Sequence, residues 1–485
     1  MPYVFYDLET TGFDSRFDQI LQFAAVRTDE GLVEVDRLEV RCRLLSYVVP
    51  SPGALLLTGT GPRTLRDPGL PSHFEAMRRI HQKLTEWSPG VFLGFNSINF
   101  DEGFLRQAFF KVLLPVYLTN SEGNSRADAM RIVQAASVFA PDCLVVPLGK
   151  RGRPSFRLEG LSRANGFPHD KAHDAMADVE ATLFLVRLVR ERAPDVWEAM
   201  NLTARKRSVI DILTKHKALI LTEFYAGPRS YWVAYCGANP DDDSEHAVFD
   251  LSNDPREFME LSVEALAEVL ETSPKVVRSV RANRHPILMP MECAPAGAAG
   301  PGISSEELNR RAAWIRGNPD FRHRVGQAMR RRYPEEGWSP HVEDQLYQGF
   351  FEAGDRSLMA QFHRVDWDER LILGDLFGDP RIKEMAARVL YEERPELVEG
   401  QARIDRASWV RARLLDENKD VPWMTIPKAF RELDLLMDGA DEDRKRILGE
   451  IEEFLRGYLR EAHPTSAVPS RPGGPAPGRG PARPS

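Results

Sequence analysis

The chain has 485 residues, of which 42% are hydrophobic and 28% charged, with 64 Lys and Arg against 72 Asp and Glu for a formal net charge of −8. This composition excludes global disorder, and the length predicts about two to four domains of roughly 100–200 residues each. The chain has no run of about 18 uncharged apolar residues, so no membrane span is predicted. Its four scattered cysteines argue against a disulfide scaffold or a zinc site. Its negative net charge argues against a nucleic-acid partner.

Residues 1–192 have the pattern of an α/β domain. Short apolar runs predict buried strands at residues 4–6, 20–27 and 91–95. Helical spacing of apolar residues predicts helices at 73–87, 101–113 and 175–192. Strands that alternate with helices predict a mixed sheet covered by helices. The chain enters its first strand at once, without a basic leader or small-residue cleavage site, so we expect a cytoplasmic protein.

The pattern changes after that domain. Residues 193–340 carry short runs rich in Val, Tyr, Trp and Phe between Gly, Pro and Asp clusters, which predict a small β-barrel with helical insertions. The runs lie at residues 230–234, 247–251 and 276–280. Residues 341–462 have helical patterns and no strand run, which predicts a helical domain. Residues 463–485 are rich in Pro, Gly and Arg without apolar periodicity, so we predict a disordered tail.

Four acidic residues stand at the ends of predicted elements. Asp7 and Glu9 close the first strand and, being two positions apart, point to the same face. Asp101 starts a helix, and Asp178 lies one turn into the long apolar helix, where Asp174 is the better N-cap. Crowded carboxylates repel one another unless a cation lies between them, and Mg²⁺ prefers oxygen ligands. Taken singly, each element is as well explained by a solvated strand end or a helix cap.

His173 precedes the long helix and makes the spacing H-x-x-x-x-D with Asp178. A lone histidine is more often structural, but this one accompanies four acids in a fixed order. Together the five residues match the DEDD exonuclease pattern of the His-bearing subtype. That pattern implies two Mg²⁺ ions (Mn²⁺ is an alternative), about 3.5–4 Å apart, which clamp the attacking and leaving oxygens of a phosphoryl displacement. His173 would take a proton from the attacking water, and the product would be a nucleoside 5′-monophosphate.

Beyond this pattern, the chain resembles the bacterial exonuclease I family of processive 3′→5′ exonucleases that degrade single-stranded DNA. The resemblance covers residues 1 to about 460 and is carried by the segments QFAAVRTD (22–29), PSFRLE (154–159), ANG (164–166), AHDAMADV (172–179) and DQLYQGFF (344–351). The last segment lies outside the catalytic domain, which separates this chain from ribonuclease T, oligoribonuclease and polymerase proofreading subunits. The resemblance implies a ribonuclease H-like exonuclease domain, an SH3-like β-barrel and an α-helical domain that close around the strand. It also implies a monomer that acts in DNA repair and recombination.

The resemblance also implies residues that contact DNA. Arg157, within PSFRLE, is expected to contact the substrate beside the metal ions, and Glu9 to contact both metal and substrate. Further candidates are Arg106, Tyr117, Arg126, Arg131, Arg278 and Arg281. Guanidinium groups hold phosphates, and aromatic rings stack on bases without sequence preference. For any single arginine, a surface position without a role is the alternative.

The chain departs from the family pattern in two features, its metal motif and one protein-binding pocket. The metal motif usually has an aromatic residue between its first two acids and Phe before its Gly, where this chain has Leu8 and Thr11. We therefore expect different base stacking near the 3′ end, with activity intact. The family also binds the acidic, apolar C-terminal tail of single-stranded-DNA-binding protein in a basic-rimmed pocket. One arginine of that pocket aligns with Ala140, so this partner is expected through an altered pocket.

Two other functions compete with this interpretation. An exoribonuclease, or a trimming enzyme that acts on both DNA and RNA, would need the same catalytic residues. A catalytically silent DNA-binding module would need a broken metal set, whereas all five positions are intact here.

The distribution of charge reverses the first conclusion about nucleic acid. Residues 241–271 hold eleven acids and one base, and without them the rest of the chain has a net charge of +2. Residues 275–332 hold twelve bases and four acids. The total charge therefore reflects segregation into an acidic and a basic stretch, and it does not exclude a DNA partner.

Overall fold

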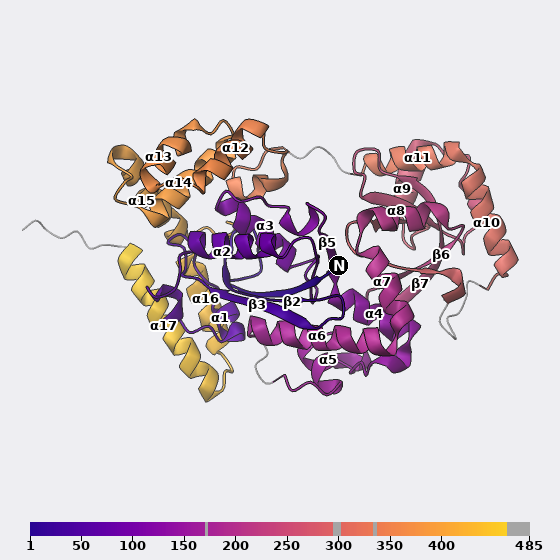
Figure 1. Cartoon of the computed structure of the whole chain (residues 1–485), viewed down its shortest axis with the longest axis horizontal. Helices are drawn as coiled ribbons and strands as arrows, with labels where there is room; N and C mark the ends of the chain where they lie inside the picture. The colour runs from indigo at the N-terminus through magenta and orange to yellow at the C-terminus, as the bar shows by residue number, and fades with distance from the viewer. Residues whose placement is uncertain (170–172, 294–301, 333–336, 463–485) are drawn as a thin grey trace, which may run out of the picture.

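A computed structural model of the chain describes residues 1–169, 173–293, 302–332 and 337–462. Figure 1 shows three regions: an N-terminal sheet with its helices in the middle, a second sheet with helices on one side, and the C-terminal helices on the other. The predicted tail, residues 463–485, lies outside the described residues.

The N-terminal region is a mixed sheet flanked by helices, as predicted. Its strands are β1 (Tyr3–Thr10), β2 (Ile20–Thr28), β3 (Glu34–Arg41), β4 (Val91–Gly94) and β5 (Ser125–Asp128). Its helices are α1 (Pro52–Thr58), α2 (His73–Glu86), α3 (Asp101–Lys111), α4 (Ala129–Phe139), α5 (Leu158–Ala164) and α6 (Ala175–Arg192). The strand order is β3-β2-β1-β4-β5, with β1 antiparallel to β2 and parallel to β4.

The central strand β1 is packed on both faces. Tyr3 and Phe5 join the apolar core that includes α4 and α6, whereas Val4, Tyr6 and Leu8 join the core that includes α2 and α3. In Figure 1 these two helix layers lie on opposite sides of the sheet. Because side chains alternate along a strand, the two acids at the end of β1 lie on the same face as α6.

The second region is built on an antiparallel sheet with the order β10-β6-β7-β8-β9. Its strands are β6 (Leu219–Phe224), β7 (Pro228–Ala238), β8 (Glu245–Asp250), β9 (Val277–Arg281) and β10 (Ile287–Pro290). Its helices are α7 (Pro194–Thr203), α8 (Lys206–Lys215), α9 (Val263–Glu271), α10 (Ser305–Gly317) and α11 (Pro319–Arg330). The three predicted strand runs are confirmed as β7, β8 and β9, and the helical insertions are also confirmed.

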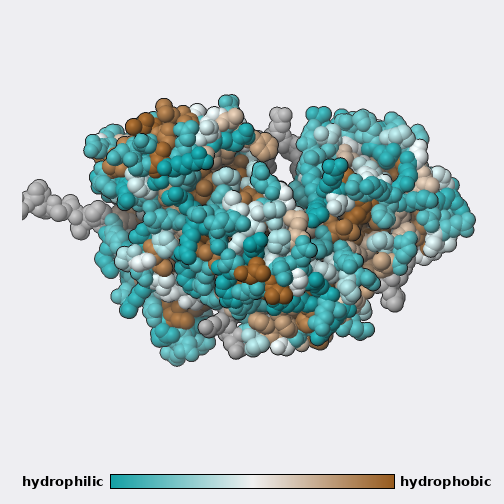
Figure 2. Space-filling view, viewed as in Figure 1, coloured by the Kyte–Doolittle hydropathy of each residue, from teal (hydrophilic) through white to brown (hydrophobic). Residues whose placement is uncertain are grey.

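The C-terminal region is helical, as predicted, with no strand among the described residues 337–462. Its helices are α12 (Ala353–Phe362), α13 (Trp367–Leu376), α14 (Pro380–Glu393), α15 (Gly400–Leu415), α16 (Ile426–Met437) and α17 (Glu442–Ala462). Figure 2 shows a mostly hydrophilic face with an apolar patch over this region, and Leu371, Ile372 and Leu376 of α13 are among its exposed apolar residues. Within the described residues, no helix has the length and apolar character needed to span a membrane.

A buried ion-pair network around Glu343 joins these helices to the N-terminal region. The Glu343 carboxylate lies 2.7 Å from Arg388 Nη1 and 3.0 Å from Arg413 Nη2, and all three side chains are at most 6% exposed. Burial alone would raise the pKa of Glu343, but the two guanidinium charges hold it at about 2. The Glu343 carbonyl accepts a hydrogen bond of 2.9 Å from Gln107, so the network is fixed to the helix that begins with Asp101.

Candidate active site

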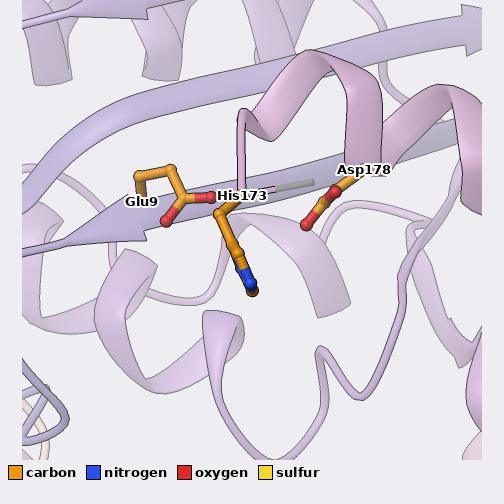
Figure 3. Close-up of side chains that lie close together, drawn as sticks. All are labelled: Glu9, His173 and Asp178. Atoms are coloured by element: carbon orange, nitrogen blue, oxygen red, sulfur yellow. The ribbon is translucent and has the colours of Figure 1, made fainter. Parts of the chain in front are cut away.

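Glu9, His173 and Asp178 converge where β1 ends and α6 begins. One ligand atom of each lies within 4.8 Å of the others, and Figure 3 shows the two carboxylates on either side of the imidazole. Glu9 is 7% exposed, and the Asp178 side chain 15%. A strand end and a helix start thus bring together residues 169 positions apart in the sequence.

The start of α6 leaves Asp178 available to the site. Asp174 is the N-cap, as predicted, with its carboxylate accepting the Ala177 N–H at 3.4 Å. The Asp174 carboxylate also accepts a hydrogen bond from Arg41 at 2.7 Å. His173, just before the cap, has φ of +68°, in the left-handed region that residues other than glycine seldom adopt. In Figure 3 the His173 side chain lies between the carboxylates of Glu9 and Asp178.

Asp7 and Asp101 lie outside the 4.8 Å group but act on it electrostatically. Burial and the charges of Asp101, Asp178 and Glu9 raise the pKa of Asp7 well above its usual range. Asp101 is the first residue of α3 and is 3% exposed, while the N-cap position belongs to Phe100. Asp101 therefore has no capping role, which leaves its carboxylate available to the site.

Arg41 near Glu9 and His169 near Asp178 only partly offset the burial and mutual repulsion of the four carboxylates. Burial and the charges of Asp178 and Asp101 raise the pKa of Glu9 to about 9. Burial, with smaller contributions from neighbouring acids, raises the pKa of Asp101 to about 8. Burying several ionised carboxylates together costs free energy unless a cation pairs with them. The carboxylate oxygens of these four residues are the kind of ligand that a hard divalent cation such as Mg²⁺ prefers, and His173 stands beside them.

These pKa values predict how stability depends on pH and metal. Because their pKa values are raised on folding, Glu9 and Asp101 bind more protons in the folded than in the unfolded state between about pH 4 and pH 9. The metal-free protein should therefore lose stability as pH rises through this window. Mg²⁺ should remove much of the loss, because it supplies the charge that protons supply at low pH. Thermal unfolding at about pH 5.5 and pH 8.5, in EDTA and in Mg²⁺, measures this. Between the two pH values we expect the Tm to fall by roughly 5 °C more in EDTA than in Mg²⁺. An equal fall in Tm in EDTA and in Mg²⁺ would contradict the prediction.

His169 also belongs to the site, although sequence reasoning missed it. It is 1% exposed, and its Nε2 lies 2.7 Å from Asp178 Oδ1. The available signal was a second histidine four residues before His173, giving H-x-x-x-H-x-x-x-x-D. Spacing alone could not show that this side chain turns inward.

The loop before Asp101 is tightly packed against β1. Gly94 ends β4, and a Cβ there would lie 2.4 Å from the carbonyl oxygen of Tyr6 and 2.9 Å from Ser97 Cβ. A larger residue would force the strand and the loop apart, so only glycine fits. This close approach brings Asp101 to the end of β1, where the other acids lie.

The second region also supports that loop, through a buried histidine between β9 and β10. His285 is 1% exposed; its Nδ1 accepts the Asp128 N–H at 2.8 Å and its Nε2 donates to the Met200 carbonyl at 2.8 Å. The Asp128 carboxylate in turn accepts the N–H of Asn96, the residue at which the loop turns, at 3.0 Å. Burial lowers the pKa of His285 to about 4, so the ring is neutral near pH 7.

The two residues before His285 contact the same part of the molecule. Arg284 Nη1 donates to the Ile98 carbonyl at 3.3 Å, and the Asn283 carbonyl accepts a hydrogen bond of 3.3 Å from Arg126. Residues 283–285, which we call the β9–β10 turn, therefore hold the Asp101 loop from the side of the second region.

Two predicted DNA contacts, Arg106 and Arg126, surround a buried acid. Arg126 Nη1 lies 2.9 Å from Glu102 Oε2 and Arg106 Nη2 3.5 Å from it. The Arg106 guanidinium also lies over the Tyr117 ring, 5.1 Å from its centroid. Tyr117 faces the largely exposed ring of Phe350, with 6.3 Å between centroids. These residues form a half-buried set at the junction of the N-terminal and C-terminal regions.

Arg131 and Arg281 line a cavity of about 620 Å³ between the first and second regions, together with Arg284 and Tyr225. Partial burial and the neighbouring arginine charges lower the pKa of Arg284. Crowded cations of this kind favour an anionic ligand.

Arg157 and Arg278 differ in what they can offer a substrate. Arg157 is the N-cap residue of α5, and its side chain is exposed. Arg278 is 6% exposed, lies 2.7 Å from Glu223 and stacks on Tyr231. Arg278 is thus paired with an acid inside the second region, whereas Arg157 lies at the surface, and the DNA contact of each stays a prediction.

The two residues that depart from the family's metal motif are both buried. Leu8 is 5% exposed and Thr11 is fully buried, with its hydroxyl donating to Asp18 at 3.0 Å. Phe13, two residues after Thr11, is 76% exposed and lies 6.5 Å from the Phe100 ring. Phe13 thus presents an exposed aromatic ring beside Phe100, the residue before Asp101.

Comparisons with known proteins agree with this arrangement over nearly the whole chain. Family models described as Exonuclease, Exonuclease I SH3-like domain and Exonuclease I C-terminal domain match residues 4–186, 205–331 and 340–458. Exodeoxyribonuclease I of Escherichia coli is 30% identical over 399 residues, covering 79% of this chain and 83% of that protein. That of Haemophilus influenzae is 28% identical, covering 78% and 84%.

Solved structures give the same result. E. coli exonuclease I in complex with a dA16 oligonucleotide has a TM-score of 0.82 at 26% identity, covering 94% of this chain and 99% of that one. A moderately thermophilic exonuclease I from Methylocaldum szegediense has a TM-score of 0.80 at 26% identity, with the same coverage. The predicted fold class is thereby confirmed: a ribonuclease H-like exonuclease domain, an SH3-like domain and a helical C-terminal domain. These matches, which cover most of the chain, show that it belongs to the exonuclease I family.

Proposed function

We propose that the chain is a Mg²⁺-dependent 3′→5′ exodeoxyribonuclease that degrades single-stranded DNA to nucleoside 5′-monophosphates. The observation that carries this proposal is the convergence of Glu9, His173 and Asp178, with Asp7 and Asp101 beside them, in a chain whose relatives are named exodeoxyribonuclease I. A zinc-bound complex of E. coli exonuclease I with single-stranded DNA has been solved, which supports a divalent metal site in the family.

In this proposal the chain's own residues bind, orient and accept a proton. The carboxylates of Asp7, Glu9, Asp101 and Asp178 would hold the Mg²⁺ ions, which would supply charge to activate a water molecule and to stabilise the departing 3′-oxygen. His173, half-buried between Glu9 and Asp178, would take the proton of the attacking water. Arg157, exposed at the start of α5, holds the phosphate beside the site.

We place the path of the DNA strand between the three regions. The arginine-lined cavity formed by Arg131, Arg281 and Arg284 suits the phosphate backbone. Tyr117, Phe350 and Phe13 offer aromatic rings on which bases can stack. E. coli exonuclease I has been solved with dA16 and dT13 oligonucleotides, which supports a single-stranded substrate here.

The remaining proposals concern organisation and partners. We propose domain boundaries near residues 192 and 340, a monomeric cytoplasmic enzyme and a role in DNA repair and recombination. We also propose that it binds the C-terminal tail of single-stranded-DNA-binding protein. Ala140, at the end of α4, stands where the family has an arginine of that pocket. We therefore expect Ala140→Arg to tighten binding of a tail peptide in a fluorescence anisotropy titration, and unchanged binding would argue against this location of the pocket.

The preference for DNA over RNA separates this proposal from the exoribonuclease alternative. Matched 3′-labelled DNA and RNA oligomers of one sequence should be shortened at rates that differ by about tenfold or more in favour of DNA with Mg²⁺, and neither should be shortened in EDTA. The 2′-hydroxyl is the main local difference between the two substrates. Faster loss of the RNA oligomer would favour the alternative.

A further inference from the structure

His169 is held rigidly between α5 and α6, behind the proposed metal site. One ring nitrogen, Nε2, lies 2.7 Å from Asp178 Oδ1, and the other, Nδ1, lies 3.1 Å from the Ser162 hydroxyl. The Arg163 guanidinium donates to the His169 carbonyl at 2.7 and 3.2 Å. The side chain is thus fixed at both ring nitrogens and at its backbone.

The direction of the bond to Asp178 follows from chemistry. An ionised carboxylate can only accept hydrogen bonds, so the proton between these two atoms belongs to Nε2. Asp178 must be ionised to bind a cation. His169 therefore donates to one oxygen of Asp178 and leaves the other oxygen for the metal.

His169 and His173 have different surroundings. His173 is half-buried and lies within the 4.8 Å group with Glu9 and Asp178. His169 is 1% exposed and contacts Asp178 from the side of α5. A side chain without access to water or substrate cannot be the group that activates the attacking water.

We propose that His169 is a positioning residue that fixes the Asp178 carboxylate for metal binding, an inference that rests on the proposed function. Carboxylates that bind metals are commonly oriented by such outer hydrogen bonds, and loss of one typically costs about 10–100-fold in metal affinity or activity. Helix α5 supplies the support, since Ser162 and Arg163 hold His169 while Arg157 stands at its start. One short helix therefore supports both the predicted phosphate contact and the orientation of Asp178.

Two substitutions separate the two ring nitrogens. In His169→Gln the side-chain amide nitrogen occupies the place of Nε2, so the donor to Asp178 is kept and the contact with Ser162 is lost. In His169→Asn the amide oxygen occupies the place of Nδ1, so the contact with Ser162 is kept and the donor to Asp178 is lost. Both variants lose the ring and its packing, so each is a control for the other.

The measurement is Mg²⁺ binding by titration calorimetry on the full chain without DNA, together with the Mg²⁺ concentration that gives half-maximal hydrolysis. We expect His169→Asn to weaken Mg²⁺ binding by about 10–100-fold and His169→Gln by less than about threefold. Equal weakening in both variants would overturn the proposal in favour of a packing role, as would wild-type affinity in His169→Asn. The calorimetric measurement of Mg²⁺ binding does not depend on nuclease activity. If the wild-type protein binds Mg²⁺ but fails to degrade DNA, the proposed function falls while the calorimetry still decides the role of His169.

Discussion

Asp178→Asn should reduce hydrolysis of single-stranded DNA by more than about a thousandfold. The substitution keeps the shape of the side chain but removes a charge and a strong ligand from the group formed with Glu9 and His173. Loss of an outer hydrogen bond to a metal ligand typically costs about 10–100-fold, so loss of the ligand itself should cost more. Release of labelled mononucleotide with saturating Mg²⁺ measures the effect.

The chain offers a matched control on the same helix. Glu180 lies two residues after Asp178, pairs with Arg37 and has 43% of its side chain exposed, so Glu180→Ala should leave the rate within about twofold. Asp178→Asn should also be as stable as the wild-type protein in EDTA or more so, because it removes one of the crowded buried charges whose pKa is raised. A folded Asp178→Asn protein that retains wild-type activity would refute the proposed metal site.

Glu343→Gln should lower the free energy of unfolding of the C-terminal helices by about 3–5 kcal/mol. It leaves Arg388 and Arg413 with a neutral amide in place of a shared carboxylate, in a setting where all three side chains are at most 6% exposed. Hydrogen exchange of the α14 and α15 backbone amides and the midpoint of urea unfolding both report the effect.

An exposed ion pair of the same residue types provides the comparison. Glu450 lies 3.0 Å from Arg446 on α17, and both side chains are more than half exposed. Glu450→Gln should cost no more than about 0.5 kcal/mol, because water and salt screen such pairs. Similar losses for the two variants would show that burial of the Glu343 network contributes little.

The parts of the fold with strong local signals could be predicted from the sequence. The predicted helix 175–192 agrees with α6 at both ends, since Asp174 provides a cap at one end and Pro194 follows the other. The strand β3 was missed because it is an edge strand with several exposed charged residues and hence no apolar run. The strands β6 and β10 were missed because each is a short apolar run, and the pattern of such a run does not distinguish a strand from a buried helix segment.

The candidate site could be predicted in part for a similar reason. Asp7, Glu9, Asp101, His173 and Asp178 stand at strand ends and helix starts, where the local sequence determines their position. His169 and Arg278 depend instead on which distant side chains they meet, Asp178 across a loop and Glu223 on another strand. Their roles follow from tertiary packing, which spacing along the chain does not contain.

The β9–β10 turn has a consequence for the modularity of the protein. Because His285 is bonded to Asp128 in one domain and to Met200 at the start of the other, the SH3-like domain is structurally part of the catalytic unit. A chimera that exchanges this domain for that of a relative would also exchange the residue that buttresses the Asp101 loop. A variant in which the SH3-like domain is removed should therefore also lose this support of the loop before Asp101.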